Sequence, residues 1–324
     1  MSVSPDKIYL PARKSGILSR AAAWRDRIAD SDLWRSFISS RTALPAGCFL
    51  AFTLVCVIGA PWIAPYDPRD LASINLLDAH SPPAWVKGGS SAYLLGTDEQ
   101  GRDLLSAILF GARTSLGVGA ACVALAGIIG VTLGLMAGYL GRLFDSVAMR
   151  AADIQMTIPD VMLALLVTGV LFALLPRGAQ ASAAPWVLVL AIGLSNWPQY
   201  ARVVRACTMA ERGKDYVAAA QITGVRSSRI LFGHVLLNVA GPICILGTQG
   251  IASAILAESA LSFIGVGMPL TEPSLGTLIR VGNGYLYSGE WWTTAFPALA
   301  LSSIVLSINV LGDWLKDVLN PKLG

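Results

Sequence analysis

Reactive side chains are sparse within the long apolar stretches of this 324-residue sequence. Glu258 is the clearest carboxylate inside such a stretch, and Asp160 follows Ile158-Pro159 at the start of another. A carboxylate in an apolar segment is costly, so it indicates either a functional group or a contact between helices. For Asp160, a favourable interaction with the start of a helix explains the residue without any further role. For Glu258, lining a polar path, bracing a gate and pairing with another helix are all open.

The sequence lacks the residue patterns of an enzyme active site or a nucleotide site. No G-x-S-x-G lies within an apolar stretch, and His80 and His234 have no metal-binding companions. A P-loop needs G-x-x-x-x-G-K-S/T, but Gly213-Lys214 is followed by Asp215, and Thr208 occupies the upstream glycine position. The five cysteines have no metal-type spacing. We therefore predict no catalytic residue, metal or cofactor in this chain, and an intramembrane enzyme is disfavoured.

Six apolar blocks of about 20 residues, the length that crosses a bilayer as a helix, dominate the chain. They lie near 45–65, 115–138, 158–176, 185–204, 239–263 and 293–314. Only 14% of residues are charged, against roughly 25% in soluble domains, which is too few to cover a water-exposed surface. We therefore predict an all-α integral membrane protein with six transmembrane helices. The net charge of +4 is too small to indicate nucleic-acid binding.

The distribution of basic residues predicts the orientation of the chain. If the N-terminus is cytoplasmic, the inside segments hold 18 Lys and Arg and the outside segments hold 6. Because cytoplasmic loops carry the excess of basic residues, both termini are predicted to be cytoplasmic. The predicted organisation is a cytoplasmic segment 1–44, a first helix 45–65, a periplasmic loop 66–114, a membrane core 115–315 and a cytoplasmic C-terminus 316–324.

Residues 17–38 show a separate pattern ahead of the first block. Apolar side chains recur at helical spacing, with arginines between them. This pattern predicts an amphipathic helix that lies on the inner membrane surface. A loosely ordered basic tail is the alternative.

Small and neutral polar residues also form patterns within the blocks. Gly130, Gly134 and Gly138 recur every four residues, which places them on one helix face and allows another helix to approach closely. Gln249 and Asn309 can hydrogen-bond between helices. Together with Glu258 they are candidates for lining a translocation path, and packing between helices is the alternative for each.

The connection at about 200–238, predicted to be cytoplasmic, has the pattern of two short helices. After Asp215, the run 216–223 favours helix and stops at Gly224. A second stretch, Ser227 to Leu237, begins with a serine that suits a helix N-cap. Gly224 is therefore predicted to be the pivot between two short helices.

This loop resembles the motif of the membrane subunits of ATP-binding-cassette importers, in which Glu-Ala-Ala, three residues and Gly form a short helix that docks in a cleft of the ATPase subunit. Aligned on Gly224, the alanines are Ala219 and Ala220, and Ala218 replaces the glutamate. The run 234–238 resembles the His-Ile-Leu-Pro-Asn of peptide permeases, with leucine at the proline position. The ATPase-coupling residues that the resemblance implies are Asp215, Tyr216, Ala218, Ala219, Ala220, Gly224 and Arg229.

Further blocks between about 94 and 322 resemble the C-type permease subunit of the dipeptide, oligopeptide and nickel ATP-binding-cassette importers. They are Leu95 to Asp103, Gly111 to Leu116, Gly138-Tyr139, Met149-Arg150, Asp153-Ile154, Ile158-Pro159, Leu256 to Gly265 and Asn309 to Asp317. The resemblance implies a type I importer permease fold in the bacterial inner membrane.

The same resemblance implies the partners of the chain. They are a second homologous permease subunit, two ATP-binding subunits that hold ATP and Mg, membrane lipid, and a periplasmic or lipid-anchored solute-binding protein. Peptide import and nickel or metal-chelate import both fit the resemblance. An ion-coupled secondary transporter is disfavoured, because the chain has one unpaired loop of this kind and few buried charges.

The external segment 66–114 has few apolar runs and many turn residues, so we predict an ordered cap. Asp98, Arg102 and Asp103 are close in sequence and are predicted to form local ion pairs that hold this segment for the binding protein. Exposed pairs of this kind contribute about 0–1 kcal/mol each.

Overall fold

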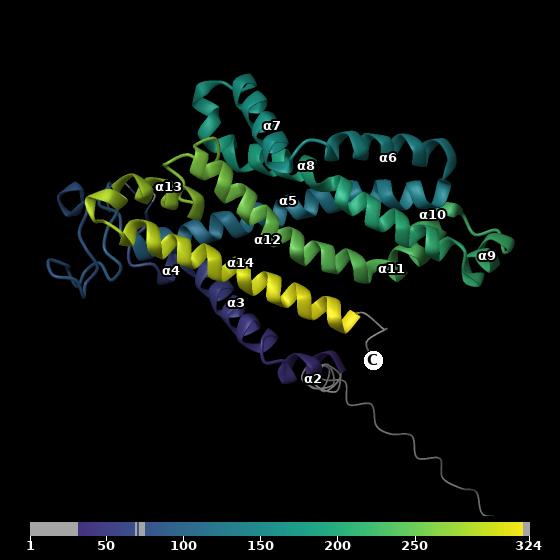
Figure 1. The fold of residues 1–324 in the computed structure, drawn as a ribbon, viewed down its shortest axis with the longest axis horizontal. Coiled ribbons are helices and arrows are strands. Elements are labelled where there is room, and N and C mark those ends of the chain that lie inside the picture. The colour runs from purple at the N-terminus through teal and green to yellow at the C-terminus, as the bar shows by residue number, and fades with distance from the viewer. Residues whose placement is uncertain (1–31, 69, 71–74, 320–324) are drawn as a thin grey trace, which may run out of the picture. The chain divides into compact units, whose positions relative to one another are not determined.

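A computed structural model describes residues 32–68, 70 and 75–319, and all regular elements within them are helical (Figure 1). The α-helices are α2 (Asp32–Ser39), α3 (Ala43–Ile58), α4 (Ala60–Ile63), α5 (Leu104–Leu140), α6 (Arg142–Met156), α7 (Asp160–Leu174), α8 (Gln180–Arg212), α9 (Asp215–Ile222), α10 (Ser227–Ile230), α11 (Leu236–Asn238), α12 (Ala240–Ile264), α13 (Leu275–Tyr285) and α14 (Trp292–Leu319). Shorter turns are η2 (Leu76–Asp78), η3 (Arg177–Ala179), η4 (Leu231–Val235) and η5 (Leu286–Ser288). The predicted all-α class is confirmed.

The chain divides into two compact units, Met1–Pro45 and Ala46–Gly324. The described part of the first unit contains α2 and the first residues of α3. The predicted surface helix at 17–38 lies largely outside the described residues, which begin at residue 32, the first residue of α2.

All six apolar blocks contain helix, but the helices differ in their capacity to cross a membrane. Four are individually long and apolar enough: α5, α8 with η3, α12 and α14. The first block is covered by the 16-residue α3, a break at Gly59 and the short α4. The third block is covered by α7, whose 15 residues extend only about 22 Å, less than the bilayer core of about 30 Å.

A helix occupies the segment 139–157, which the sequence predicted as a cytoplasmic loop. This helix, α6, is joined to α7 by a bend of 92°, and the two helices meet the length and composition of a span only together. Ion pairs connect α6 to α8: Asp145 accepts from Arg205, and Asp153 accepts from Arg202. The apolar-block criterion missed α6 because its charged residues reduce its hydropathy.

The long helix α5 begins at Leu104, eleven residues before the predicted start of the second span. The carboxylate of Asp103 caps it, accepting from the backbone N–H and the hydroxyl of Ser106. The last part of the predicted loop 66–114 is therefore helical. At the other end of the bundle, α8 continues to Arg212, so the predicted loop at 200–238 begins within a helix.

The close approach of α5 and α8 depends on the predicted glycine face. A Cβ placed on Gly130, Gly134 or Gly138 would lie 2.5–2.8 Å from backbone oxygens of α8. Because no side chain fits in that space, the two helices pack backbone to backbone along this face. The prediction that these glycines allow close helix packing is confirmed.

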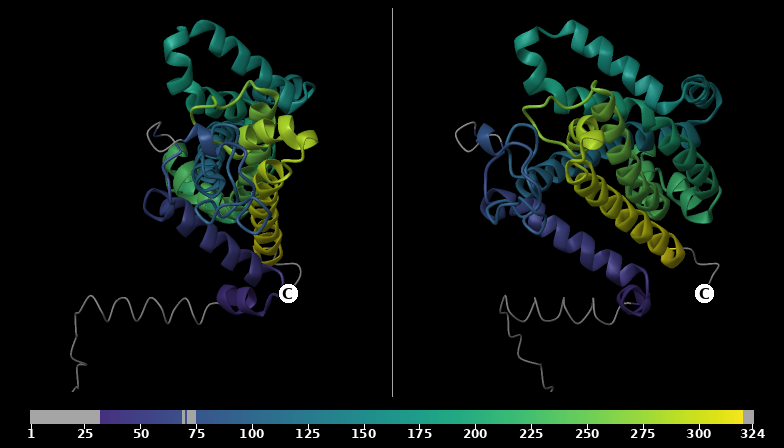
Figure 2. Two further views of the ribbon diagram at one scale, coloured as in Figure 1. Left: turned by 90° about the vertical axis from the view of Figure 1, so that its left-hand side faces the viewer. Right: turned by 60° about the vertical axis from the view of Figure 1, so that its left-hand side comes forward.

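The remaining long helices pack beside this pair. Figures 1 and 2 show α12 and α14 side by side, with α13 near the C-terminal end of α12 and the N-terminal end of α14. One apolar cluster joins α5, α12, α13 and α14, and includes Leu104, Ile255, Leu275 and Ile308. A second cluster joins α5, α7, α8 and α12 around Leu188 and Ile192.

We expect Gly134→Ala to destabilise the protein by about 1–3 kcal/mol, the typical cost of overpacking. Its Cβ would meet the carbonyl oxygen of Ala201 at 2.6 Å, and that oxygen cannot rotate away. The matched control is Gly127→Ala on the same helix, where a Cβ meets nothing within 4 Å. Thermal unfolding midpoints of the purified proteins in detergent should fall for the first variant only. Equal midpoints for both variants would contradict the close-packed face.

Candidate functional site

The connection between α8 and α12 contains the two helical stretches predicted on either side of Gly224. This glycine has a φ of +75°. Its N–H donates to the carbonyl of Gln221 at 3.1 Å, and the next N–H, of Val225, donates to Ala220 at 3.0 Å. This pair of hydrogen bonds is a Schellman motif, which closes a helix and requires a positive φ. Glycine is therefore favoured at the end of α9 because it adopts a positive φ without the strain that a side chain would add.

The second helical stretch is less regular than predicted. It consists of α10, the π-helical turn η4 and α11. The predicted serine cap is wrong, because the N-cap residue is Arg226 and Ser227 is the first helical residue. No side-chain capping bond forms at this start.

One face of α9 is fixed to the end of the helix bundle. Val217 is completely buried in an apolar cluster there. The cluster is built from α5, α8 and the second helical stretch, and it includes Leu135, Val204, Ile230 and Val235. The hydroxyl of Tyr216 donates to Glu211 at 2.8 Å and accepts from Asn238 at 3.1 Å. These contacts hold α9 against the ends of α5 and α8.

The opposite face of α9 is open to solvent. Ile222 near its end is 86% exposed, an unusual position for a large apolar side chain. The predicted coupling residues that are exposed are Asp215, Ala218, Ala219, Gly224 and Arg229. Tyr216 and Ala220 instead pack against the apolar cluster, so they support α9 rather than presenting a surface.

A polar cleft lies among the middle parts of the long helices. It has a volume of about 210 Å³ and is lined by residues of α5, α8 and α12 together with the start of α7. Its polar lining residues are Asp160, Asn196, Gln199, Tyr200, Gln249 and Ser253. A cavity with this many polar groups inside membrane-spanning helices is a functional candidate by default.

The cleft depends on a close contact between α8 and α12. The hydroxyl of Tyr200 donates to the carbonyl of Leu246 at 3.2 Å. A Cβ on Gly250 would lie 2.2 Å from the same hydroxyl oxygen, so a larger residue there would displace the Tyr200 hydroxyl from its present position. Gln249 lines the cleft, whereas Asn309 is exposed on α14 and does not.

Glu258 is enclosed elsewhere, at the junction of α5, α12 and α13, and is completely buried. Its carboxylate accepts from Ser115 at 2.7 Å, from Ser262 at 2.8 Å and from Ser259 at 3.4 Å. Ser115 in turn accepts from the backbone N–H of Leu275 at 3.3 Å. The structure therefore places Glu258 in a contact between helices, and not in the cleft with Gln249.

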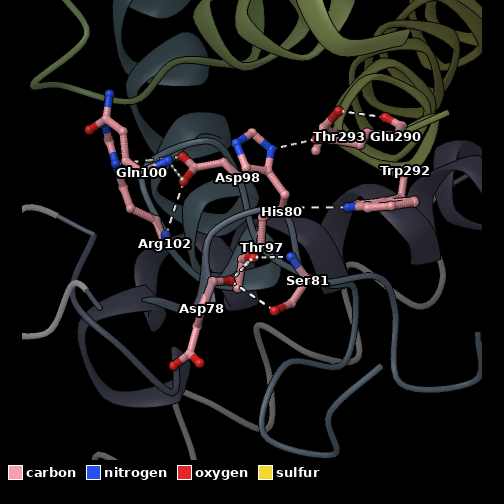
Figure 3. Close-up of polar contacts among 10 residues, drawn as sticks. All are labelled: Asp78, His80, Ser81, Thr97, Asp98, Gln100, Arg102, Glu290, Trp292 and Thr293. Carbon is pink, nitrogen blue, oxygen red and sulfur yellow. Dashed lines mark hydrogen bonds and ion pairs between the residues drawn. The ribbon is translucent and has the colours of Figure 1, made fainter. Parts of the chain in front are cut away.

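The segment that precedes α5 is ordered around Thr97, as Figure 3 shows. The fully buried Thr97 hydroxyl donates to the carbonyl of Asp78 at 2.6 Å and accepts from the N–H of Ser81 at 2.9 Å. The indole of Trp292 donates to the carbonyl of Thr97 at 3.4 Å. His80 Nδ1 lies 2.7 Å from Glu290 Oε2, which adds a second connection to the start of α14.

Asp98 and Arg102 form the predicted ion pair, with 3.5 Å between Nε and Oδ2. Both are buried, so the expectation of an exposed pair is wrong. The guanidinium also donates to the carbonyl of Leu270 at 3.1 Å. Burial raises the pKa of Asp98, and hydrogen bonding and charge from Arg102 partly oppose that rise. Asp103 caps α5 instead of joining the ion pair.

We expect Glu258→Leu to destabilise the protein, because the hydroxyls of Ser115 and Ser262 would lose their acceptor in a buried site. Each unsatisfied group costs about 1–3 kcal/mol. Glu258→Gln is the control, since its amide oxygen keeps an acceptor at the same position. The detergent unfolding midpoint should fall clearly for leucine and less for glutamine. If leucine leaves the midpoint unchanged, the serine contacts do not stabilise this junction.

Comparisons with known proteins place these features in a family. Residues 130–324 match the family described as binding-protein-dependent transport system inner membrane component, and residues 31–83 match the N-terminal transmembrane domain of oligopeptide transport permease C. The chain is 37% identical to the di/tripeptide transport system permease protein DppC of Pseudomonas aeruginosa, over 90% of this chain and 92% of that protein. It is 38% identical to the dipeptide transport system permease protein DppC of Haemophilus influenzae, over 90% and 94%.

A solved structure, of the inward-facing MetNI methionine ABC transporter, has a similar fold. The TM-score is 0.51 at 17% identity, over 67% of this chain and 98% of that chain. Membrane components of this kind work with a separate ATPase subunit and a solute-binding protein, so this chain is a multi-pass inner-membrane transport subunit and not itself an enzyme. With matches over most of its length, the chain belongs to the family of binding-protein-dependent transport system inner membrane components, the C-type permease subunits of peptide ATP-binding-cassette importers among them.

Proposed function

We propose that this chain is a permease subunit of an importer that carries short peptides into the cell. The observation that carries the proposal is the match, over nine tenths of both chains, to permeases named for dipeptide or di/tripeptide transport. The polar cleft supports it, because a peptide crossing the membrane needs hydrogen-bonding groups along its path.

The proposed complex contains a second, homologous permease subunit and two ATP-binding subunits. Docking rests on the exposed face of α9, where Ala218, Ala219 and Ile222 offer apolar contacts, and on Arg229 nearby, which offers a charged one. The 33-residue α8 extends about 50 Å and passes both the cleft and the apolar cluster that anchors α9. Movement of α9 on ATP binding would therefore reach the cleft through a continuous helix.

Six crossings are proposed for the membrane topology. They are α3 with α4, α5, α6 with α7, α8, α12 and α14, and an even number puts both termini on the same side. The excess of basic residues supports a cytoplasmic position for both. The external segment around Thr97, Asp98 and Arg102 then faces the solute-binding protein.

We expect Gly224→Val to weaken ATPase binding and peptide uptake. A side chain at a φ of +75° costs about 1–2 kcal/mol in backbone strain, which would move the end of α9. The matched control is Gly213→Val at the end of α8, where φ is −80° and a Cβ would meet no atom closer than 3.8 Å. ATPase co-purification and ATP-dependent uptake should fall for the first variant only.

Arg229→Glu tests the charged contact separately, since this side chain is exposed and its reversal should not affect folding. Normal membrane insertion is confirmed first for every variant. If Gly224→Val and Arg229→Glu both retain ATPase binding and uptake, this loop is not the coupling element.

Cysteine labelling tests the proposed orientation. Ser90 and Ser227 are both exposed; Ser90 lies in the segment 66–114 that is proposed to be external, and Ser227 begins α10 in the connection between α8 and α12. With an impermeant maleimide on intact spheroplasts, Ser90→Cys should react at once and Ser227→Cys only after permeabilisation. The unmodified chain, with its five native cysteines, sets the background. Reaction of both positions from outside would exclude this topology.

A further inference from the structure

The polar cleft has room for one end of a short peptide. Its volume of about 210 Å³ compares with about 30 Å³ for each molecule of liquid water, so it can hold several waters or one small charged group. A complete peptide of several residues would extend beyond it. The cleft is therefore suited to recognising a terminus or a side chain rather than a whole solute.

The charge of the cleft has one source. Asp160 is the only carboxylate among its lining residues, and no Lys, Arg or His of the described chain lines it. The carboxylate accepts one long hydrogen bond of 3.3 Å, donated by Gln199. This contact leaves acceptor capacity on both carboxylate oxygens. The cleft therefore presents a negative group that is not neutralised within the described residues.

Further acceptors lie in the same cleft. The side-chain amide of Gln249 has no hydrogen-bond partner among the described residues. Asn196 uses its amide nitrogen to donate to the carbonyl of Ile192 at 2.8 Å, which leaves its side-chain oxygen available. A primary ammonium group has three donors and no acceptor, and so it matches a site with one carboxylate and two amide oxygens.

We propose that this cleft transiently binds the positively charged amino end of the transported peptide, with Asp160 as its counter-ion. The proposal rests on the proposed function, and it names the part of the substrate that the permease itself recognises. Transport requires binding that is favourable enough to admit the solute and weak enough to release it. Asp160 suits this requirement because it is exposed within the cleft rather than enclosed, so its attraction for a cation is moderated by water.

The test uses the complete importer in proteoliposomes, with its binding protein at saturating concentration and labelled tri-alanine as the probe. Asp160→Asn should lower ATP-dependent uptake by about ten-fold or more, as expected for the loss of a charge-assisted hydrogen bond. Asp160→Glu should retain most uptake, because it keeps the charge. The matched control, Asp153→Asn, removes a carboxylate on α6 that lies outside the cleft and pairs with Arg202 in a half-exposed ion pair.

A second measurement separates recognition of the amine from a structural role. Uptake of N-acetylated tri-alanine, which lacks the positive charge, is compared between the wild type and Asp160→Asn. For each peptide, the uptake by the wild type is divided by the uptake by Asp160→Asn. Because the same binding protein delivers the peptide to both permeases, its own selectivity cancels in this ratio. The ratio should be near one for the acetylated peptide and about ten or more for the free peptide.

Three results would overturn the proposal: wild-type uptake by Asp160→Asn, an equal loss for Asp153→Asn, or loss of the second permease subunit from the Asp160→Asn complex. The last result would assign the carboxylate to a basic side chain of the partner. If wild-type vesicles take up no peptide on addition of ATP, the proposed function fails instead, and that outcome is distinct from all three.

Discussion

The backbone-to-backbone packing of α5 and α8 is the constraint on which the rest of the structure depends. Gly130, Gly134 and Gly138 allow an approach that no side chain would permit, and they extend over more than two helical turns. In a bilayer, burial of apolar side chains gives little driving force, so close packing of this kind supplies much of the association between helices. The two helices then serve as a shared support for the cleft at their middle and for α9 at one end.

The polar groups of this chain differ in how many hydrogen-bond partners they have, and this difference separates structural contacts from candidate binding groups. Glu258 and Thr97 are fully buried and have partners on several elements, so they join helices and loops together. The groups of the cleft are less satisfied: Asp160 has one long hydrogen bond and the Gln249 amide has none among the described residues. Asp160 is exposed and Gln249 is half-buried, so both groups keep hydrogen-bonding capacity that another molecule can reach, and such capacity within a membrane-spanning region favours a role in binding.

The sequence predicted the features that depend on local or periodic patterns. The apolar blocks, the glycine face of α5 and the turn at Gly224 each arise from residues close together in the chain. Features that depend on distant partners were not predictable in this way. The helix α6 is supported by ion pairs such as Asp145 to Arg205, across 60 positions. The burial of Arg102 depends on Leu270, and the pairing of Glu258 depends on Ser115, at separations of 168 and 143 positions.

The replacement of a glutamate by Ala218 changes what the proposed coupling contact can depend on. After Asp215, α9 carries no charged residue, so the part of the proposed ATPase contact that this helix makes would rest on shape and on burial of groups such as Ile222, beside the charged side chain of Arg229. An apolar contact can still transmit force if the helix that bears it is firmly held. Val217 provides that attachment, because it is buried in the cluster that joins α5 to α8. The glycine face in turn packs α5 and α8 backbone to backbone, so α9 is attached through Val217 to two helices that are themselves closely packed along the side of the cleft.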